Sequence, residues 1–299
     1  MRGSQCPICF IQGLSFLQAQ DYNRRISNEV FSYYKCPSCG LVYLANLPKD
    51  LDRYYPADYY SIPKDKASLL ENSTPERYKL ELVQQFIKNG HLLEIGPAWG
   101  TFSFLAKEAG FNVDVIEMDK PCCDFIQNKL GISVIQSDDP ATALAGLSGY
   151  DVIALWHVIE HLSDSFAILK AATEKLLPGG VLVVAAPNPA SFQFRVLGRF
   201  WTHLDAPRHL ALIPLDLLIR QTEALGLECV LLTTTDKGSV GWNSFGWAVS
   251  FNNFFKGRFA RYVAHYAGRI LTKLLIPIER SGLRGSAYTA IFQKAGGDR

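Results

Sequence analysis

Four of the seven cysteines in this chain of 299 residues form two close pairs near the N-terminus. Cys6 and Cys9 make the first pair, Cys36 and Cys39 make the second, and each pair encloses two residues. This spacing lets both thiolates of a pair face one ion, and four thiolates complete a closed tetrahedral Zn²⁺ site. We therefore expect a structural zinc ion in a small zinc-ribbon-like module, with two redox pairs or two disulfides as the alternatives.

A second group of residues that could bind a ligand lies around position 100. Glu94 ends an apolar run and is followed by Gly96, Pro97 and Gly100, after which a helical pattern begins. A strand, a glycine turn and a helix N-terminus together direct backbone N–H groups toward a ligand. Glu117 ends the next apolar run, at about the distance along the chain where an acid meets ribose hydroxyls. The two features together predict a nucleoside pocket.

The composition of this turn narrows the kind of nucleoside. Pro97 and Trp99 crowd the place where a pyrophosphate would approach the backbone, and Glu94 would repel a phosphate. An acidic side chain suits a positively charged ligand instead. S-adenosylmethionine has a sulfonium, an ammonium group and no phosphate, so the turn is consistent with that nucleoside.

A regular alternation of elements must position these residues. From position 91 onward, short apolar runs alternate with amphipathic helical segments, which is typical of a doubly wound α/β fold with a parallel sheet. One connecting helix is expected over residues 164–177, ended by Pro178 and the two glycines after it. The expected strands are 91–95, 112–117, 133–136, 151–156, 181–186, 228–234 and 287–293.

These residues resemble the class I S-adenosylmethionine-dependent methyltransferases, in their bacterial small-molecule branch. Residues 91–188 hold the family's core motifs in order, from the acidic glycine turn to the motifs of the fourth and fifth strands at 155–162 and 177–188. Ala98 replaces the central glycine of the family's commonest turn. The resemblance implies methyl transfer from S-adenosylmethionine and a Rossmann-like seven-stranded sheet whose last strand is antiparallel.

The resemblance also implies a cofactor site. The acidic turn would hold the methionine part of S-adenosylmethionine, the acid of the second strand would hold the ribose, and Asp138 or Asp139 would contact the adenine. The cofactor-binding residues implied in this way are Glu94, Gly96, Pro97, Gly100, Glu117, Met118, Asp138, Trp156 and His157.

Three histidines are candidates for a base that removes a proton from the acceptor. His157 follows the fourth strand, and His203 and His209 follow the fifth, at the strand ends where open α/β sheets bind ligands. Histidine titrates near neutral pH, so it suits proton removal. We expect His209 or His203 as the base and His157 as a further candidate. For His157 and His161 the alternative is capping and packing of the following helix.

A charged pair in the same segment has two interpretations. Arg208 would hold an anionic group of the acceptor, whose charge it matches. Alternatively, Asp205 and Arg208 form a local salt bridge that fixes the loop. If the salt bridge forms, neither side chain is available to bind the acceptor.

A long insert at about 240–283 precedes the last strand. Apolar residues recur there at helical spacing, and basic residues recur on the opposite face, which predicts a basic amphipathic helix. Such a helix favours peripheral contact of residues 245–278 with an anionic membrane surface. A lid over the substrate pocket and a homodimer face are the alternatives. The apolar residues at this spacing include Val263, Tyr266, Ile270 and Leu274.

These patterns divide the chain into three parts. Residues 1–45 form the zinc-binding module, residues 46–89 form a connector that contains a helix, and residues 90–299 form the methyltransferase domain with its insert. Neither an apolar leader nor an apolar run of about 18 residues is present, so we expect a cytoplasmic protein, peripheral to the inner face of the membrane if the insert binds lipid.

Charge and composition restrict the function further. The net charge is +2, but residues 240–299 hold nine Lys and Arg against two acidic residues, so the remainder of the chain is acidic. An acidic body argues against DNA as a partner and makes RNA an unfavoured one. We expect a methyltransferase for a small-molecule acceptor such as a sugar, a polysaccharide precursor or a secondary metabolite. The alternatives are a zinc-ribbon-guided RNA methyltransferase and a non-catalytic nucleoside-binding scaffold.

Overall fold

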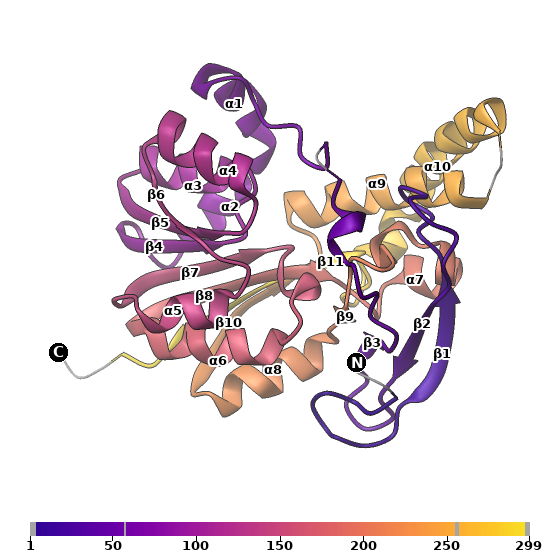
Figure 1. The fold of residues 1–299 in the computed structure, drawn as a ribbon, viewed down its shortest axis with the longest axis horizontal. Coiled ribbons are helices and arrows are strands. Elements are labelled where there is room, and N and C mark those ends of the chain that lie inside the picture. Colours follow the sequence, from indigo (N-terminus) through magenta and orange to yellow (C-terminus); the bar gives the residue numbers. More distant parts are fainter. Residues whose placement is uncertain (1–3, 57, 255–256, 297–299) are drawn as a thin grey trace.

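The computed structural model describes residues 4–56, 58–254 and 257–296; of residues 72 and 258–261 only the backbone is described. The strands of these residues form a seven-stranded central sheet and a four-stranded sheet around the N-terminal segment (Figure 1). The expected α/β class, with a Rossmann-like sheet and a small cysteine-containing part, is confirmed.

The central sheet has the strand order β10-β11-β8-β7-β4-β5-β6. β11 runs antiparallel to both of its neighbours, β8 and β10, while β4 pairs in parallel with β5 and β7. The expected antiparallel last strand is therefore confirmed, and it is an inner strand of the sheet. The strands are β4 Gly90–Ile95, β5 Phe111–Glu117, β6 Ser133–Gln136, β7 Tyr150–Trp156, β8 Leu176–Pro187, β10 Leu227–Thr233 and β11 Ala287–Lys294.

Both faces of this sheet are covered because successive side chains along each strand point to opposite faces. On β4, Leu93 and Ile95 join the core cluster under α5, α6 and α8, and Leu92 joins the cluster under α2, α3 and α4. Runs that are apolar throughout are what a parallel sheet buried on both faces requires. The helices are α2 Arg77–Val83, α3 Thr101–Glu108, α4 Lys120–Phe125, α5 Pro140–Ala145, α6 Ser165–Lys175 and α8 Leu215–Ala224.

One helix boundary differs from its expected position. α6 ends at Lys175, because Leu176 already pairs with Tyr150 on β7. Pro178 and the two glycines after it lie within β8 and do not end the helix. A Cβ atom added at Gly180 would lie 2.9 to 3.1 Å from three backbone oxygen atoms, so the strands approach closely at this glycine.

The N-terminal sheet has the order β1-β2-β3-β9, and its last strand comes from a distant part of the sequence. β9 pairs with β3, so that Leu212 lies opposite Val42. The cysteine-containing segment therefore shares a sheet with the segment that carries His209. A third core cluster joins the two, with Tyr33 and Trp201 among its members. The strands are β1 Leu14–Ala19, β2 Phe31–Lys35, β3 Val42–Leu44 and β9 Ala211–Leu212.

The connector and the insert are helical. In the insert, α9 and α10 cross closely at Gly268, where an added Cβ atom would lie 2.5 Å from the carbonyl oxygen of Trp247. None of the helices in the described residues is both long enough and apolar enough to span a membrane. The remaining helical elements are η1 Asp52–Tyr54, α1 Lys66–Ser73, η2 Thr74–Glu76, η3 Ile126–Leu130, η4 Ile159–His161, α7 Phe192–Leu197, η5 Gly198–Phe200, η6 Thr202–Leu204, α9 Lys237–Phe254 and α10 Arg258–Glu279.

Candidate functional site

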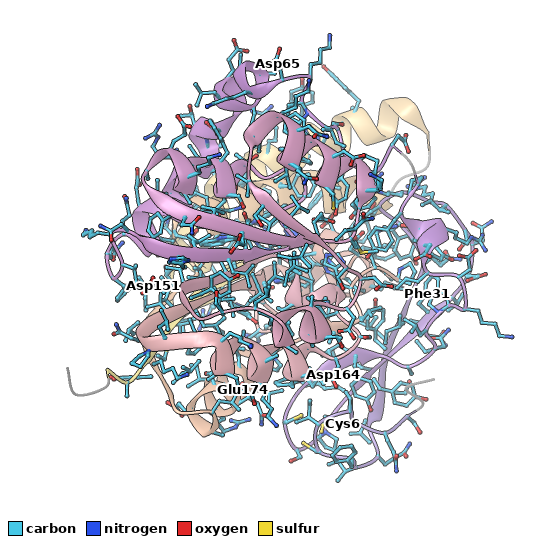
Figure 2. The ribbon with its side chains drawn as sticks, turned by 60° about the vertical axis from the view of Figure 1, so that its left-hand side comes forward. Cys6, Phe31, Asp65, Asp151, Asp164 and Glu174 are labelled. Atoms are coloured by element: carbon cyan, nitrogen blue, oxygen red, sulfur yellow. The ribbon has the colours of Figure 1, made fainter. Side chains whose placement is uncertain are left out.

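The four cysteines converge at one end of the N-terminal sheet. Their sulfur atoms all lie within 4.8 Å of one another, and the Sγ atoms of Cys6 and Cys39 are 3.7 Å apart. All four are free thiols, so the disulfide alternative is not what the structure shows. Figure 2 shows Cys6 and the neighbouring sulfur atoms at the opposite end of this sheet from Phe31. The predicted convergence is confirmed.

The two cysteine pairs have the same local geometry. The N–H groups of Cys9 and Cys39 approach the Sγ atoms of Cys6 and Cys36 at 3.5 and 3.4 Å. Burial alone would raise the pKa of Cys36, but the backbone N–H groups of Cys39 and Ser38 lower it to about 7. Equivalent backbone donors act on Cys6, but there burial outweighs them and raises the pKa. Four sulfur atoms in two such knuckles match a tetrahedral Zn²⁺ site.

The glycine turn between β4 and α3 depends on left-handed backbone conformations. Gly96 and Gly100 have φ angles of +67° and +79°, and Ala98 has a φ angle of +51°. A Cβ atom added at Gly96 would lie 2.6 Å from Cγ2 of Val158, so this turn packs directly against the residues after β7. The turn therefore needs glycine at position 96, and α3 begins where it ends.

Two buried carboxylates hold the turn. Glu94 accepts hydrogen bonds from the backbone N–H of Ser103 at 3.0 Å and from the Ser103 hydroxyl. Glu117 accepts from the N–H of Ala98 at 3.0 Å and from the N–H groups of Met118 and Asp119 at 2.8 Å. Two carboxylates beside a turn would repel a phosphate and attract a cation, so the donor set fits S-adenosylmethionine better than a dinucleotide.

Burial raises the pKa of Glu94 to about 7, although the positive charge of Lys79 and the hydrogen bonds from Ser103 act against it. Burial also raises the pKa of Glu117, against the lowering effect of its three backbone donors. Both side chains are almost inaccessible to water. Burial therefore disfavours the charged form of both carboxyl groups.

The other implied cofactor residues occupy different surroundings. Pro97 is buried in the turn, Met118 is 57% exposed next to Glu117, and Asp138 is exposed after β6. Trp156 is buried beneath the sheet edge, with its ring centroid 5.5 Å from that of Phe102, and its Nε1 has no hydrogen-bond partner among the described residues. Asp139, the other candidate for the adenine contact, caps α5 by accepting from Thr142.

His157 follows β7 and lies beside the buried carboxylate of Glu160. Its backbone has a φ angle of +58°, and its N–H donates to the carbonyl oxygen of Ala185 at 2.9 Å. Its Nδ1 lies 3.7 Å from Oε1 of Glu160, and Nε2 of His209 lies 4.0 Å from the same oxygen. Burial would raise the pKa of Glu160, but the nearby imidazoles of His157, His209 and His161 lower it.

The environments of His203 and His209 differ. Nδ1 of His209 lies 2.8 Å from the carbonyl oxygen of His203. A carbonyl oxygen only accepts, so Nδ1 carries the hydrogen and Nε2 of the neutral ring keeps a lone pair that faces Glu160. His203 lies 3.1 Å from the carbonyl oxygen of Trp242 and packs among aromatic rings, where burial lowers its pKa to about 3. His203 therefore remains neutral.

Arg208 is completely buried between two carboxylates. Its Nη2 lies 2.6 Å from Asp21 and 2.7 Å from Asp205. The salt-bridge interpretation of Asp205 and Arg208 is therefore the correct one, and the guanidinium does not face an acceptor. Asp21 was not predicted, because nothing near it in the sequence marks it as a partner of a residue 187 positions away.

Tyrosines of the connector link the glycine turn to the histidines. The ring of Tyr60 lies 6.0 Å from that of Trp99 in the turn, and further tyrosine contacts lead to Tyr55. The hydroxyl of Tyr55 lies 3.0 Å from Nδ1 of His161. These tyrosines and Glu160 were not predicted as site residues. Two signals for them are present in the sequence: the spacing of three residues between His157 and Glu160, and the run of tyrosines in the connector.

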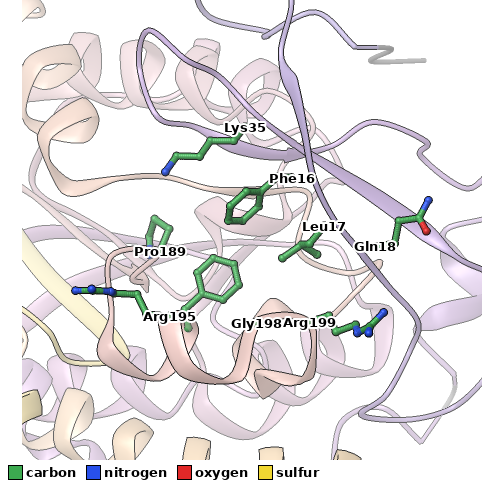
Figure 3. Close-up of a pocket in the computed structure, with 9 residues that line it drawn as sticks. Phe16, Leu17, Gln18, Lys35, Pro189, Arg195, Gly198 and Arg199 are labelled. Carbon is green, nitrogen blue, oxygen red and sulfur yellow. The ribbon is translucent and has the colours of Figure 1, made fainter.

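A separate cavity of about 560 Å³ lies between β1 and α7 (Figure 3). Phe16 and three basic side chains, Lys35, Arg195 and Arg199, line it. Its lining residues differ from those of the turn and the histidine cluster. The turn, Glu117 and His157 lie instead at the carboxyl ends of β4, β5 and β7, the edge where open α/β sheets bind ligands.

The chain is similar to two proteins named ubiquinone biosynthesis O-methyltransferase. It is 30% identical over 123 residues to the one from Cereibacter sphaeroides and 25% identical over 119 residues to the one from Hydrogenovibrio crunogenus. The matches cover 39% and 37% of this chain and 50% and 48% of those proteins. The chain thus spans about half the length of the curated relatives that it matches.

Solved structures show the same fold at low sequence identity. A proposed sarcosine dimethylglycine methyltransferase from Galdieria sulphuraria aligns over 83% of this chain and 99% of its own, with a TM-score of 0.52 and 14% identity. An O-methyltransferase family protein from Burkholderia thailandensis aligns over 83% of this chain and 64% of its own, with a TM-score of 0.50 and 11% identity.

The family described as a methyltransferase domain matches residues 71–232, which is more than half of the chain. This match includes the glycine turn, Glu117 and the histidine cluster around Glu160. It agrees with the resemblance to class I S-adenosylmethionine-dependent methyltransferases that the motifs suggested. The chain therefore belongs to the methyltransferase-domain family.

Proposed function

We propose that the protein transfers a methyl group from S-adenosylmethionine to a hydroxyl group of a small-molecule acceptor. The proposal rests on one observation: a turn with buried carboxylates and a cluster of imidazoles around Glu160 lie at the same edge of the central sheet. The turn with its buried carboxylates suits a cationic nucleoside, and the cluster of His157, Glu160 and His209 suits proton removal. The relatives named as O-methyltransferases support oxygen as the methylated atom.

The cofactor would lie along the carboxyl ends of β4 and β5. When bound, S-adenosylmethionine supplies an electrophilic methyl group on its sulfonium. Glu94 and the turn from Gly96 to Gly100 would hold its methionine part, and Glu117 its ribose. The exposed side chain of Met118 would lie over the adenine. Little else is required of the protein than alignment of the acceptor oxygen with this methyl carbon.

His157 is the base that the geometry favours. The side chain of His157 is 21% exposed, whereas His203 and His209 are buried. Glu160 lies 3.7 Å from Nδ1 of His157 and would stabilise the imidazolium that forms when the ring takes the acceptor's proton. In this arrangement His209 and His203 support the site from inside.

The acceptor would lie among aromatic rings. Trp242 of α9 packs against His157, and Tyr55 of the connector, which contacts Tyr59, packs against His161. Flat apolar surfaces with hydroxyl groups suit a sugar ring or an aromatic metabolite. We therefore retain a sugar, a polysaccharide precursor or a secondary metabolite as the acceptor, with no DNA partner.

The cysteine cluster would hold structural Zn²⁺. Such an ion would supply folding energy to a segment with a small core of its own, and no catalytic role is needed. The contacts of this module with the rest of the chain, through β9 and Arg208, make it a support for the histidine cluster.

Incubation of the purified protein with metabolite extract and isotopically labelled S-adenosylmethionine tests the proposal. We expect label in a small molecule, and mass spectrometry of the fragments identifies the atom. His157→Gln should lower the rate by about 100-fold or more at saturating cofactor, and calorimetry measures separately any loss of cofactor affinity. His265→Gln, on α10, is the matched control. Label in RNA alone would favour the RNA methyltransferase, and no heat of cofactor binding would favour the scaffold.

The exposed face of α10 supports a second part of the proposal, peripheral contact with an anionic membrane from the cytoplasmic side. Ile270 is 64% exposed and Leu274 is 69% exposed, with Arg269 and Lys273 exposed beside them. An apolar stripe flanked by basic side chains suits an anionic lipid surface. Residues 255 and 256, within the expected contact segment, lie outside the described residues.

Flotation with vesicles tests this contact. We expect the protein to float with vesicles that contain phosphatidylglycerol at low salt, and Ile270→Ser with Leu274→Ser to abolish flotation. Vesicles of phosphatidylcholine alone are the control. Failure to float, with a concentration-dependent dimer in sedimentation that the same substitutions abolish, would assign the face to a homodimer instead.

A further inference from the structure

Glu160, His161 and His209 direct donor atoms toward one point. One ligand atom of each residue lies within 4.8 Å of the others, and the centroids of the two imidazole rings are 4.6 Å apart. Nitrogen and oxygen ligands lie about 2.0–2.2 Å from a transition-metal ion, so two ligands of a tetrahedral site are about 3.4 Å apart. The three side chains would therefore have to move inward, by up to about 1.4 Å between ligand atoms, to contact one ion.

The carboxylate of Glu160 is incompletely satisfied. Its Oε2 is buried and has no hydrogen-bond partner among the residues that the structure describes, and the side chain is 2% exposed. A buried acceptor without a partner is destabilising by about 1–3 kcal/mol, and more when it is charged. The other oxygen, Oε1, lies near His157 and His209. A cation at Oε2 would provide the missing partner.

Oxygen atoms outside the cluster orient both imidazoles. The carbonyl of His203 accepts from Nδ1 of His209, and the hydroxyl of Tyr55 lies 3.0 Å from Nδ1 of His161. Histidines that bind metals are held in this way, with one ring nitrogen on an outer partner and the other on the ion. His161 also has a hydrogen bond to the backbone of Arg208, which an ion bound at this ring would have to replace.

We propose that Glu160, His161 and His209 bind a divalent transition-metal ion beside the methyl-transfer site, separate from the ion of the cysteine cluster. Two imidazoles and one carboxylate suit Zn²⁺, Fe²⁺, Mn²⁺ or Co²⁺ and leave coordination positions open. The hard cations Ca²⁺ and Mg²⁺ prefer ligand sets made of oxygen, so this donor set disfavours them.

The role of such an ion rests on the proposed function. His157 would take the proton of the acceptor hydroxyl, and an ion held by Glu160, His161 and His209 would supply a positive charge beside that oxygen. The oxygen then forms a bond to the methyl carbon while the bond from that carbon to sulfur breaks and its electron pair stays on sulfur. The products are a methyl ether, the thioether form of the cofactor and one proton on His157.

Titration of the metal-free full-length chain with Co²⁺ tests the site without any substrate. Thiolate ligands give cobalt an intense charge-transfer band in the near ultraviolet, whereas nitrogen and oxygen ligands give only weaker visible bands. We expect binding in two phases, one with the thiolate band and one without it. Zn²⁺ content after dialysis, measured by mass spectrometry of the elements, should give the same result.

Variants show which residues bind the metal in the second phase of the titration. Glu160→Gln and His161→Gln should weaken it by about 100-fold or more and leave the thiolate band unchanged. Tyr55→Phe removes an outer partner and should weaken it by about 10- to 100-fold. His265→Gln should change neither phase. A wild-type titration with the thiolate phase alone, or a second phase that both Glu160→Gln and His161→Gln retain, would overturn the site.

The same proteins separate this inference from the proposed function. If two phases are present and no acceptor is methylated, the site stands and the methyltransferase proposal fails. If methylation is equally fast with metal at the cysteine cluster alone and with metal at both sites, the second ion has no catalytic role. The methyltransferase proposal then still stands. Thermal unfolding of each variant shows whether Glu160→Gln or His161→Gln acts only by unfolding the chain, in which case Tyr55→Phe decides.

Discussion

The cysteine cluster and the Glu160 cluster bring ligands together in two different ways. Each cysteine pair is held by hydrogen bonds within its own short segment, such as those from the N–H groups of Cys9 and Cys39 to sulfur. The carboxylate of Glu160 meets His209 only because β9 and its preceding loop return to the carboxyl end of β7. Each half of the first site is local in sequence and the halves meet within one small module, with Cys6 and Cys39 33 positions apart. The second site joins two segments that only the fold of the whole chain brings together.

The two clusters are nevertheless connected. The hydroxyl of Tyr33, on β2, donates to the carbonyl oxygen of His209 at 2.9 Å. Asp21, between β1 and β2, pairs with Arg208, next to His209. The local site therefore supports the assembled one, and disturbance of the cysteine module should reach the histidines.

Removal of the zinc ligands should have the largest effect. Cys36→Ser with Cys39→Ser leaves half of the ligands, and metal binding contributes about 10–16 kcal/mol to folding of small zinc modules. We expect loss of zinc, unfolding of the N-terminal sheet and loss of methyl transfer, measured by zinc content and hydrogen exchange. Cys229→Ser is the matched control. Full protection of β2 and β3 in the double variant would show that the module does not depend on the ion.

Arg208→Met breaks the link between the two clusters. It leaves Asp21 and Asp205 buried without their partner, so we expect the free energy of unfolding to fall by about 3–5 kcal/mol. Arg220→Met removes an exposed ion pair with Asp216 and should change the free energy of unfolding by less than about 1 kcal/mol. Chemical denaturation measures both. Equal effects of the two substitutions would mean that the buried pair does not hold the module.

The carboxyl group of Glu94 makes stability depend on pH. Its pKa is raised from 4.5 to about 7 by burial, so the folded state keeps a proton that the unfolded state loses. The stabilisation is complete below pH 4.5 and is lost as the pH rises to 7, by about 3 kcal/mol at most. The difference in unfolding free energy between wild type and Glu94→Gln should fall over this range. A difference that rises with pH would contradict the assignment.

Glu117→Gln should have the smallest of these effects on stability. The amide keeps one acceptor oxygen and loses the charge, so the turn loses one or two of its three backbone partners, worth about 1–3 kcal/mol in all. We expect cofactor affinity, measured by calorimetry, to fall by about 10-fold. Glu108→Gln, on the exposed end of α3, is the control. Unchanged affinity would remove Glu117 from the cofactor site.

Much of the fold was predictable because it depends on local pattern. The strands from β4 to β8 were placed within a few residues, since runs that are apolar throughout are required when both faces of a parallel sheet are buried. The end of α6 was misplaced because pairing of Leu176 with Tyr150 overrides the tendency of proline and glycine to end a helix. The convergence of the cysteines followed from their spacing alone.

The sequence by itself predicted the cysteine cluster, the succession of strands and helices and the turn between Glu94 and Gly100, because the spacing within each cysteine pair, the apolar runs and the glycines of the turn are local signals. Only the tertiary structure decided that Arg208 is held by Asp21, that His203 is enclosed by aromatic rings and that Glu160 faces His209. These contacts join segments separated by 40 residues or more, or depend on which face of a loop is buried. Which residues meet depends on how the N-terminal sheet and α9 pack against the rest of the chain. The spacing of residues in the sequence does not predict that packing.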